Sequence, residues 1–180
     1  MKKHITRYTP PNTSLLSEST HPVLQKVLLH RNVTDLKELR YTLDQLLPFD
    51  GLLDINKAVD ILIAGLENSA HILILGDFDA DGATSTTLAV SALKAFGAEN
   101  VSYLVPNRFE YGYGLTPEIV DVAALRQPHI IMTVDNGISS CAGVLRAKEH
   151  GMQVIITDHH LPGAETPQAD AIVNPNQHGD

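Results

Sequence analysis

Residues 71–82 read HILILGDFDADG, a short apolar run that ends in three carboxylates at alternate positions. The apolar part, Ile72 to Leu75, is rich in strand-forming residues, and Asp77, Asp79 and Asp81 follow it directly. Carboxylates at this density repel one another and are costly to hold near the end of a buried strand. One aspartate would be enough to cap a following helix, so three of them indicate that a cation binds between them.

The spacing Asp-x-Asp-x-Asp-Gly also occurs in the calcium loop of EF-hand proteins. Such a loop needs a helix before it and a glutamate at its twelfth position, which, counted from Asp77, is Leu88. Leu88 has no oxygen to offer, and the residues before Asp77 have a strand pattern. We therefore expect a metal cluster at the carboxyl end of a strand, followed by a helix that begins near Ala83.

Composition limits the classes of protein to which the chain can belong. The chain has 180 residues, 43% of them hydrophobic, and a formal net charge of −8, which argues against coating nucleic acid through a basic surface. No apolar run approaches the ~20 residues of a membrane span, and the N-terminus lacks the apolar stretch of a secretory signal. A single cysteine, Cys141, excludes an internal disulfide. These features predict a cytoplasmic protein.

The hydrophobic pattern divides the chain into three parts. Residues 1–20 are polar and predict a flexible arm, and residues 21–69 predict a helical lead-in with helices from Pro22, over 36–47 and after Asn56. From residue 70 to 180, strands alternate with helices, which predicts an α/β fold with a parallel five-stranded sheet flanked by helices. The expected strands are 72–75, 101–105, 130–134, 154–157 and 171–173, and the expected helices cover about 83–96, 117–127 and 140–150.

Polar residues follow each expected strand, where ligands bind in open parallel sheets. After the aspartate cluster these are Asn107-Arg108, Asp135-Asn136-Gly137, Asp158-His159-His160 and Asn174-Pro175-Asn176. Carboxylates with a few imidazoles and no thiolate suit Mn²⁺ or Mg²⁺, and the set is large enough for two ions that share a bridging aspartate.

The loop after the second expected strand is the candidate for substrate binding. Arg108 can pair with phosphate oxygens, and the Gly112/Gly114 loop lets backbone amides approach a phosphate. Three aromatic residues of this loop are either stacking surfaces for a nucleobase or ordinary packing residues, namely Phe109, Tyr111 and Tyr113.

These motifs together resemble the DHH phosphoesterase superfamily, which takes its name from the Asp-His-His sequence seen here at Asp158-His159-His160. Four longer strings resemble the branch of that superfamily that degrades single-stranded DNA from the 5′ end, namely GDFDADGATST, YLVPNRFEYGYGL, TVDNGISS and VIITDHHLPG. The resemblance runs from about His71 to the end of the chain.

The resemblance implies a role for each motif residue. It implies that Asp79, Asp81, Asp135 and His159 are metal ligands, that Asp135 bridges two Mn²⁺ or Mg²⁺ ions, and that Asp77 and Asp158 orient the ligands. It implies that His160 acts at the scissile phosphate together with the catalytic Asp135 and Asp81, and that Asn107 and Arg108 contact the substrate. The implied substrate is single-stranded DNA, in repair and recombination, with single-strand-binding protein and a RecQ-type helicase as partners.

The family pattern continues beyond Asp180 with a further aspartate ligand, a second domain and an OB-type DNA-binding module. We therefore expect residues 70–180 to be the N-terminal portion of a DHH domain, and the isolated chain to be inactive or nearly so. Alternatives are a DHH-family phosphoesterase for short oligonucleotides or cyclic dinucleotides, and a non-catalytic binding module. A dinucleotide-binding redox domain is disfavoured, because no Gly-x-Gly-x-x-Gly follows the first strand.

Overall fold

The computed structural model describes residues 4, 6, 20–33 and 35–180, which form two compact units that divide between Leu47 and Pro48. The flexible arm expected over residues 1–20 lies almost wholly outside the described residues. None of the described helices has the length and apolarity needed to cross a membrane.

The first unit contains α1 (Pro22–His30) and two short 3₁₀ turns, η1 (Leu36–Leu39) and η2 (Leu43–Gln45). Leu28 and Leu29 of α1 form a small cluster with three partly buried residues, Val33, Leu36 and Leu39. The continuous helix predicted over 36–47 is wrong, because the backbone is extended at Arg40 and Thr42. Leu43, Leu46 and Leu47 are all more than 70% exposed, so no packing among the described residues stabilises the second half of the predicted helix.

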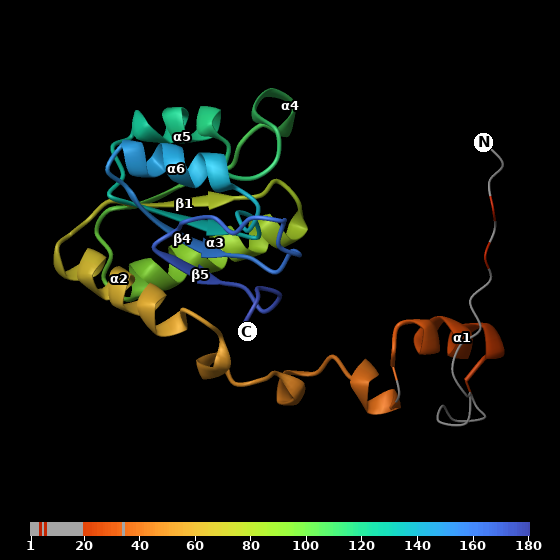
Figure 1. Cartoon of the computed structure of the whole chain (residues 1–180). Coiled ribbons are helices and arrows are strands. Elements are labelled where there is room, and N and C mark those ends of the chain that lie inside the picture. Colours follow the sequence, from red (N-terminus) through yellow and green to blue (C-terminus); the bar gives the residue numbers. More distant parts are fainter. Residues whose placement is uncertain (1–3, 5, 7–19, 34) are drawn as a thin grey trace. The chain divides into compact units, whose positions relative to one another are not determined.

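The second unit is a three-layer α/β structure, as the sequence predicts (Figure 1). Its strands are β1 (Ile72–Gly76), β2 (Val101–Leu104), β3 (Ile130–Val134), β4 (Gln153–Thr157) and β5 (Ala171–Val173). All neighbouring strands are parallel and lie in the order β2-β1-β3-β4-β5. The helices that follow η3 (Phe49–Gly51) are α2 (Ile55–Glu67), α3 (Ala80–Ala95), α4 (Arg108–Tyr111), α5 (Pro117–Ala124) and α6 (Cys141–Glu149).

Alternate residues of the central strands pack against helices on opposite faces of the sheet. Leu73 and Leu75 of β1 belong to the core cluster that includes α5 and α6, whereas Ile72 and Ile74 belong to the cluster that includes α2 and α3. The central strands are therefore continuous apolar runs, because both faces of the sheet are covered. The helical lead-in expected over 21–69 is divided between the two units, since α2 packs on the sheet.

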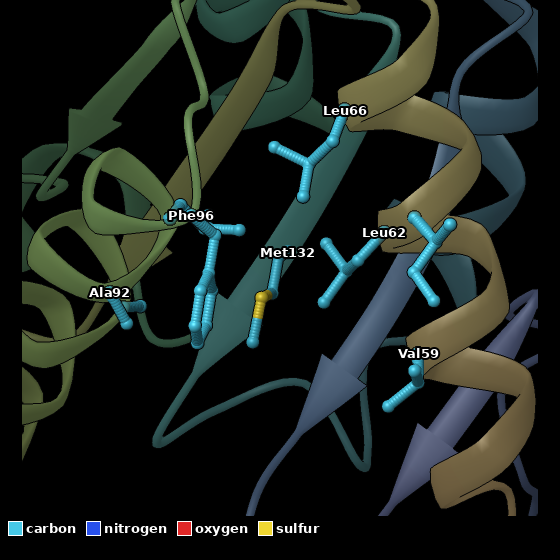
Figure 2. A pocket seen from close by; sticks show the side chains of 9 residues that line it. Val59, Leu62, Leu66, Ala92, Phe96 and Met132 are labelled. Carbon is cyan, nitrogen blue, oxygen red and sulfur yellow. The ribbon is translucent and has the colours of Figure 1, made fainter.

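An apolar groove lies between α2 and α3 above β3 and has a cavity volume of about 310 Å³ (Figure 2). Met132 forms its floor, and the side chains around it come from α2 and α3, namely Val59, Leu62, Ile63, Leu66, Ala89, Ala92, Leu93 and Phe96. No residue of the aspartate and histidine motifs lines this groove, so it is separate from the polar edge of the sheet.

Candidate metal centre

Asp77 follows β1 directly and is buried, with 7% of its surface exposed. Its Oδ1 accepts the backbone N–H of Phe78 at 2.8 Å, and its Oδ2 lies 3.3 Å from Nη2 of Arg108. Gly82 packs against this turn so closely that a Cβ there would lie 2.3 Å from the Asp77 carbonyl oxygen. The glycine of the Asp-Gly pair therefore lets α3 begin directly beside the buried carboxylate.

Asp79 is the N-cap of α3, and its Oδ1 accepts the backbone N–H of Gly82 at 3.0 Å. This hydrogen bond is the largest influence that lowers the pKa of the Asp79 carboxyl, with a smaller contribution from the positive charge of Arg108. The helix predicted from Ala83 begins three residues earlier, at Ala80, because Asp79 supplies the cap.

Asp135 follows β3 and has left-handed backbone geometry, with φ at 63°. Its carboxylate is largely buried, and its Oδ1 lies 3.0 Å from Nε2 of His159. Burial, followed by repulsion from Asp79, raises the pKa of the Asp135 carboxyl, and the contact with His159 partly opposes this rise. The negative charge of Asp135 therefore destabilises the site, and a bound cation would compensate for it.

Asp158 follows β4 and organises the turn that carries the two histidines. Its Oδ1 accepts the backbone N–H groups of His159 and His160 at 2.7 and 3.1 Å and lies 2.7 Å from Nδ1 of His160. Its Oδ2 accepts the backbone N–H of Ile138 at 2.9 Å. The hydrogen bond to Asp158 is the main cause that raises the pKa of His160.

The side chains at this edge form two groups whose potential ligand atoms lie within 4.8 Å of one another. One group is Asp77, Asp79 and Asp135, and the other is Asp135, His159 and His160. Asp135 is the member common to both. Carboxylates and imidazoles without thiolates are a donor set that fits Mn²⁺ or Mg²⁺.

Asp81, which the sequence suggested as a ligand, belongs to neither group among the described residues. It lies in the first turn of α3 and is exposed. Asp77, which the resemblance assigns to orienting the ligands, lies in the first group of potential ligands and also contacts Arg108. The predicted roles of Asp81 as a ligand and a catalytic residue stay predictions.

Arg108 lies beside the first group and is held by three side chains. Its guanidinium carbon lies 4.0 Å from the ring centre of Phe78 and 5.0 Å from that of Tyr113, and Nη2 contacts Asp77. Cation–π contacts of this kind orient a guanidinium and leave its remaining donors free to bind an anion. The contribution of Phe78 was not evident from the sequence, where it is one apolar residue between two aspartates.

The structure separates the three aromatic residues of the Arg108 loop. Phe109 is fully exposed, Tyr111 packs against a core cluster, and Tyr113 points into the site. Burial and the nearby carboxylates raise the pKa of Tyr113 to about 12, so its hydroxyl stays protonated at neutral pH. Asn107 caps α4, because its Oδ1 accepts the backbone N–H of Phe109 at 3.1 Å.

Asparagines after β3 and β5 hold the backbone of the site. Nδ2 of Asn136, which is 1% exposed, donates to the carbonyl oxygens of Leu75 and Val134 and thereby links the ends of β1 and β3. Nδ2 of Asn174 donates to the His160 carbonyl oxygen at 3.0 Å, and Nδ2 of Asn176 donates to that of His159. The Asn-Pro-Asn turn after β5 thus supports the backbone of the histidine turn.

Residues 71–180 match the model of the DHH family, N-terminal domain. The chain is 48% identical over 175 residues to the single-stranded-DNA-specific exonuclease RecJ of Salmonella typhimurium, covering 97% of this chain and 30% of that protein. It is also 48% identical to the RecJ of Haemophilus influenzae over 176 residues, covering 98% of this chain and again 30% of the relative. The chain therefore spans about 30% of the length of these curated relatives.

Two solved structures resemble the chain closely enough to compare the fold. A crystal structure of exonuclease RecJ bound to manganese has a TM-score of 0.67 and 36% identity, over 75% of this chain and 34% of that one. RecJ of Thermus thermophilus in complex with Mn²⁺ has a TM-score of 0.62 and 32% identity, over 84% and 21% of the two chains. The chain belongs to the DHH family, whose N-terminal domain corresponds to its residues 71–180.

Proposed function

We propose that this chain is the metal-binding portion of a RecJ-type exonuclease, which hydrolyses phosphodiester bonds of single-stranded DNA from the 5′ end. The observation that carries the proposal is that Asp135 is shared by two groups of potential metal ligands at the carboxyl edge of the sheet. Its relatives are named for single-stranded-DNA-specific exonuclease activity, and solved relatives hold Mn²⁺. The expected metal is Mn²⁺ or Mg²⁺, with two ions in the complete enzyme.

Three sets of residues would have different roles in the reaction: binding the metal ions, binding the phosphate and donating a proton. Asp79, Asp135 and His159, joined by Asp77 or Asp81, would hold the ions, which when bound stabilise charge on the phosphoryl group and activate water. Arg108 would bind the phosphate through the guanidinium donors that Asp77 leaves free. His160, oriented by Asp158, would protonate the leaving oxygen or stabilise its charge.

The chain covers about 30% of the length of its relatives, so the proposal extends from this chain to the activity, polarity and partners of a longer protein. We expect the whole protein to act on single-stranded DNA in repair and recombination and to be cytoplasmic. Its expected partners are single-strand-binding protein and a RecQ-type helicase. We expect the isolated chain to have little or no activity, because a further ligand and the opposite wall of the substrate cleft are expected from the rest of the family pattern.

Calorimetric titration of Mn²⁺ into the chain tests the metal site directly. We expect weak binding, of one ion, which Asp135→Ala abolishes because that residue belongs to both ligand groups. Two tightly bound ions would show that the site is already complete, and would contradict the expectation of an inactive chain. Absence of any binding that depends on Asp135 would contradict the proposed metal site.

A chimera tests the activity. In it, this chain replaces the matching segment of the Haemophilus influenzae RecJ, to which it is 48% identical. We expect Mn²⁺-dependent release of mononucleotides from a 5′-phosphorylated single strand, abolished by Asp135→Ala, with double-stranded DNA resistant. Preferential hydrolysis of dinucleotides or cyclic dinucleotides would instead favour a small-substrate phosphoesterase, and metal binding without turnover would favour a non-catalytic module.

A further inference from the structure

The loop between α4 and α5 directs one side chain, that of Tyr113, into the metal centre. Tyr113 is flanked by Gly112 and Gly114, whose φ angles of +76° and +77° are accessible mainly to glycine. The end of the loop is anchored where the backbone N–H of Leu115 donates to Oγ of Ser140 at 3.2 Å. The two glycines therefore turn the chain around Tyr113, and Ser140 holds the turn in place.

Tyr113 contacts the two residues to which the proposed function assigns substrate chemistry. Its ring lies 5.0 Å from the guanidinium carbon of Arg108 and forms an edge contact with the ring of His160, at a centroid distance of 5.8 Å. Its hydroxyl oxygen lies 3.2 and 3.4 Å from Nδ1 and Nε2 of His160 and 3.4 Å from the carbonyl oxygen of Asp135.

The contacts of Asp158 and of Asp135 fix two of these hydrogen bonds. Nδ1 of His160 donates to Oδ1 of Asp158, which lies closer to it than the phenol does. The carbonyl oxygen of Asp135 can only accept, so the Tyr113 hydroxyl donates to it. The oxygen of the same hydroxyl lies beside the imidazole edge of His160, slightly nearer to Nδ1 than to Nε2. The imidazole is thus in contact with both the Asp158 carboxylate and the Tyr113 hydroxyl.

We infer that Tyr113 is a positioning residue that aligns the phosphate-binding Arg108 with the proton-donating His160 over the metal centre. This inference rests on the proposed function, because it assumes that both residues act on the same phosphate. The ring acts on Arg108 through the cation–π contact, and Phe78 makes a second cation–π contact with the guanidinium at 4.0 Å. The hydroxyl contacts the imidazole of His160 and the backbone carbonyl oxygen of Asp135.

The two parts of the side chain make separable contributions. Tyr113→Phe keeps the ring over Arg108 and removes the hydroxyl contacts, so it should impair the proton transfer and leave phosphate binding intact. Tyr113→Leu removes both. Tyr103→Phe makes the same atomic change at a half-exposed tyrosine of β2 that has no contact with the site, and it is the matched control.

The kinetic experiment uses the chimera with Mn²⁺ and a 5′-phosphorylated single strand. We expect Tyr113→Phe to lower kcat about tenfold with KM within about twofold of wild type, a loss of ~1.4 kcal/mol in transition-state stabilisation. Tyr113→Leu should lower kcat further and also raise KM. A kcat for Tyr113→Phe equal to that of Tyr103→Phe would overturn the inference, while a wild-type chimera without activity would count against the proposed function.

A second measurement needs no turnover and uses this chain alone. In NMR spectra, the side-chain signals of Arg108 and the ring signals of His160 should both shift in Tyr113→Leu and stay unchanged in Tyr103→Phe. In Tyr113→Phe, only the His160 signals should shift substantially. If Tyr113→Leu leaves the signals of both residues unchanged, Tyr113 does not position them, whatever the chimera does.

Discussion

Nδ1 of His160 lies 2.7 Å from Oδ1 of Asp158, and the same oxygen accepts the backbone N–H of His160. The carboxylate of Asp158 is almost completely buried, whereas the imidazole is about half exposed. His160 is therefore fixed through Nδ1, and its Nε2 is left for a substrate. Because the buried Asp158 carboxylate accepts a hydrogen bond from the His160 imidazole, protonation of His160 affects the stability of the fold.

His160→Gln should destabilise the metal-free chain in a manner that depends on pH. The hydrogen bond to Asp158 raises the pKa of folded His160 above its ordinary 6.5. The charged pair therefore contributes its full stabilisation below pH ~6.5, and this contribution is lost as the pH rises through the folded pKa. Urea unfolding across this pH range should show that the free energy of unfolding of His160→Gln falls furthest below that of wild type at acidic pH. The gap should shrink as the pH rises.

His178→Gln is the control for this prediction, because it makes the same side-chain change at an exposed histidine outside the site, and it should change the free energy of unfolding only slightly. A difference between wild type and His160→Gln that stays constant from pH ~5.5 to ~8.5 would mean that the pair contributes as a neutral hydrogen bond only.

Asp135→Asn should stabilise the metal-free chain while it weakens Mn²⁺ binding. Burial and repulsion by Asp79 raise the pKa of Asp135, so its charged form costs stability at neutral pH. Asparagine removes the charge and tolerates the left-handed backbone at φ 63°. We expect the free energy of unfolding at pH 7, with chelator present, to rise by on the order of 1 kcal/mol.

Asp135→Ala separates the two effects. It removes the same charge but places an alanine in left-handed geometry, which costs about 1–2 kcal/mol, so its stability should fall below that of Asp135→Asn. Mn²⁺ should raise the melting temperature of wild type only. A less stable Asp135→Asn would show that the contact between Asp135 and His159 outweighs the repulsion.

Asn136→Ala should lower both the stability and the affinity for Mn²⁺. The buried amide donates to the Leu75 and Val134 carbonyl oxygens, which lie just before Asp77 and Asp135 in the chain. Losing these two buried hydrogen bonds should lower the free energy of unfolding by about 1–3 kcal/mol. The spacing of the two aspartates should also loosen, so calorimetry should show weaker Mn²⁺ binding by Asn136→Ala.

Asn68→Ala is the matched control, because Asn68 donates in the same way to a carbonyl oxygen, that of Ala64, but at an exposed helix end. We expect its effect on stability to stay within about 0.5 kcal/mol and its Mn²⁺ affinity to equal that of wild type. Equal Mn²⁺ affinities for Asn136→Ala and Asn68→Ala would show that the link between β1 and β3 does not set the metal site.

Periodicity and turn residues were enough to predict most of the fold. The strands at 72–75, 130–134 and 171–173 were located to within one residue, because a strand buried on both faces is a continuous apolar run that ends at polar residues. The helix predicted over 36–47 failed for the opposite reason, since regularly spaced leucines form a helix only where another surface covers them.

The sequence by itself determined that the aspartate and histidine motifs meet at one edge, because every strand is parallel and each motif follows a strand. Only the tertiary structure decided which side chains of that edge approach one another. The strand order β2-β1-β3-β4-β5 brings Asp135 between Asp79 and His159, and Arg108 between Phe78 and Tyr113. Asp79 and Asp135, for example, are 56 positions apart in the sequence. No local pattern encodes such contacts, because they depend on how separate loops pack after the sheet has formed.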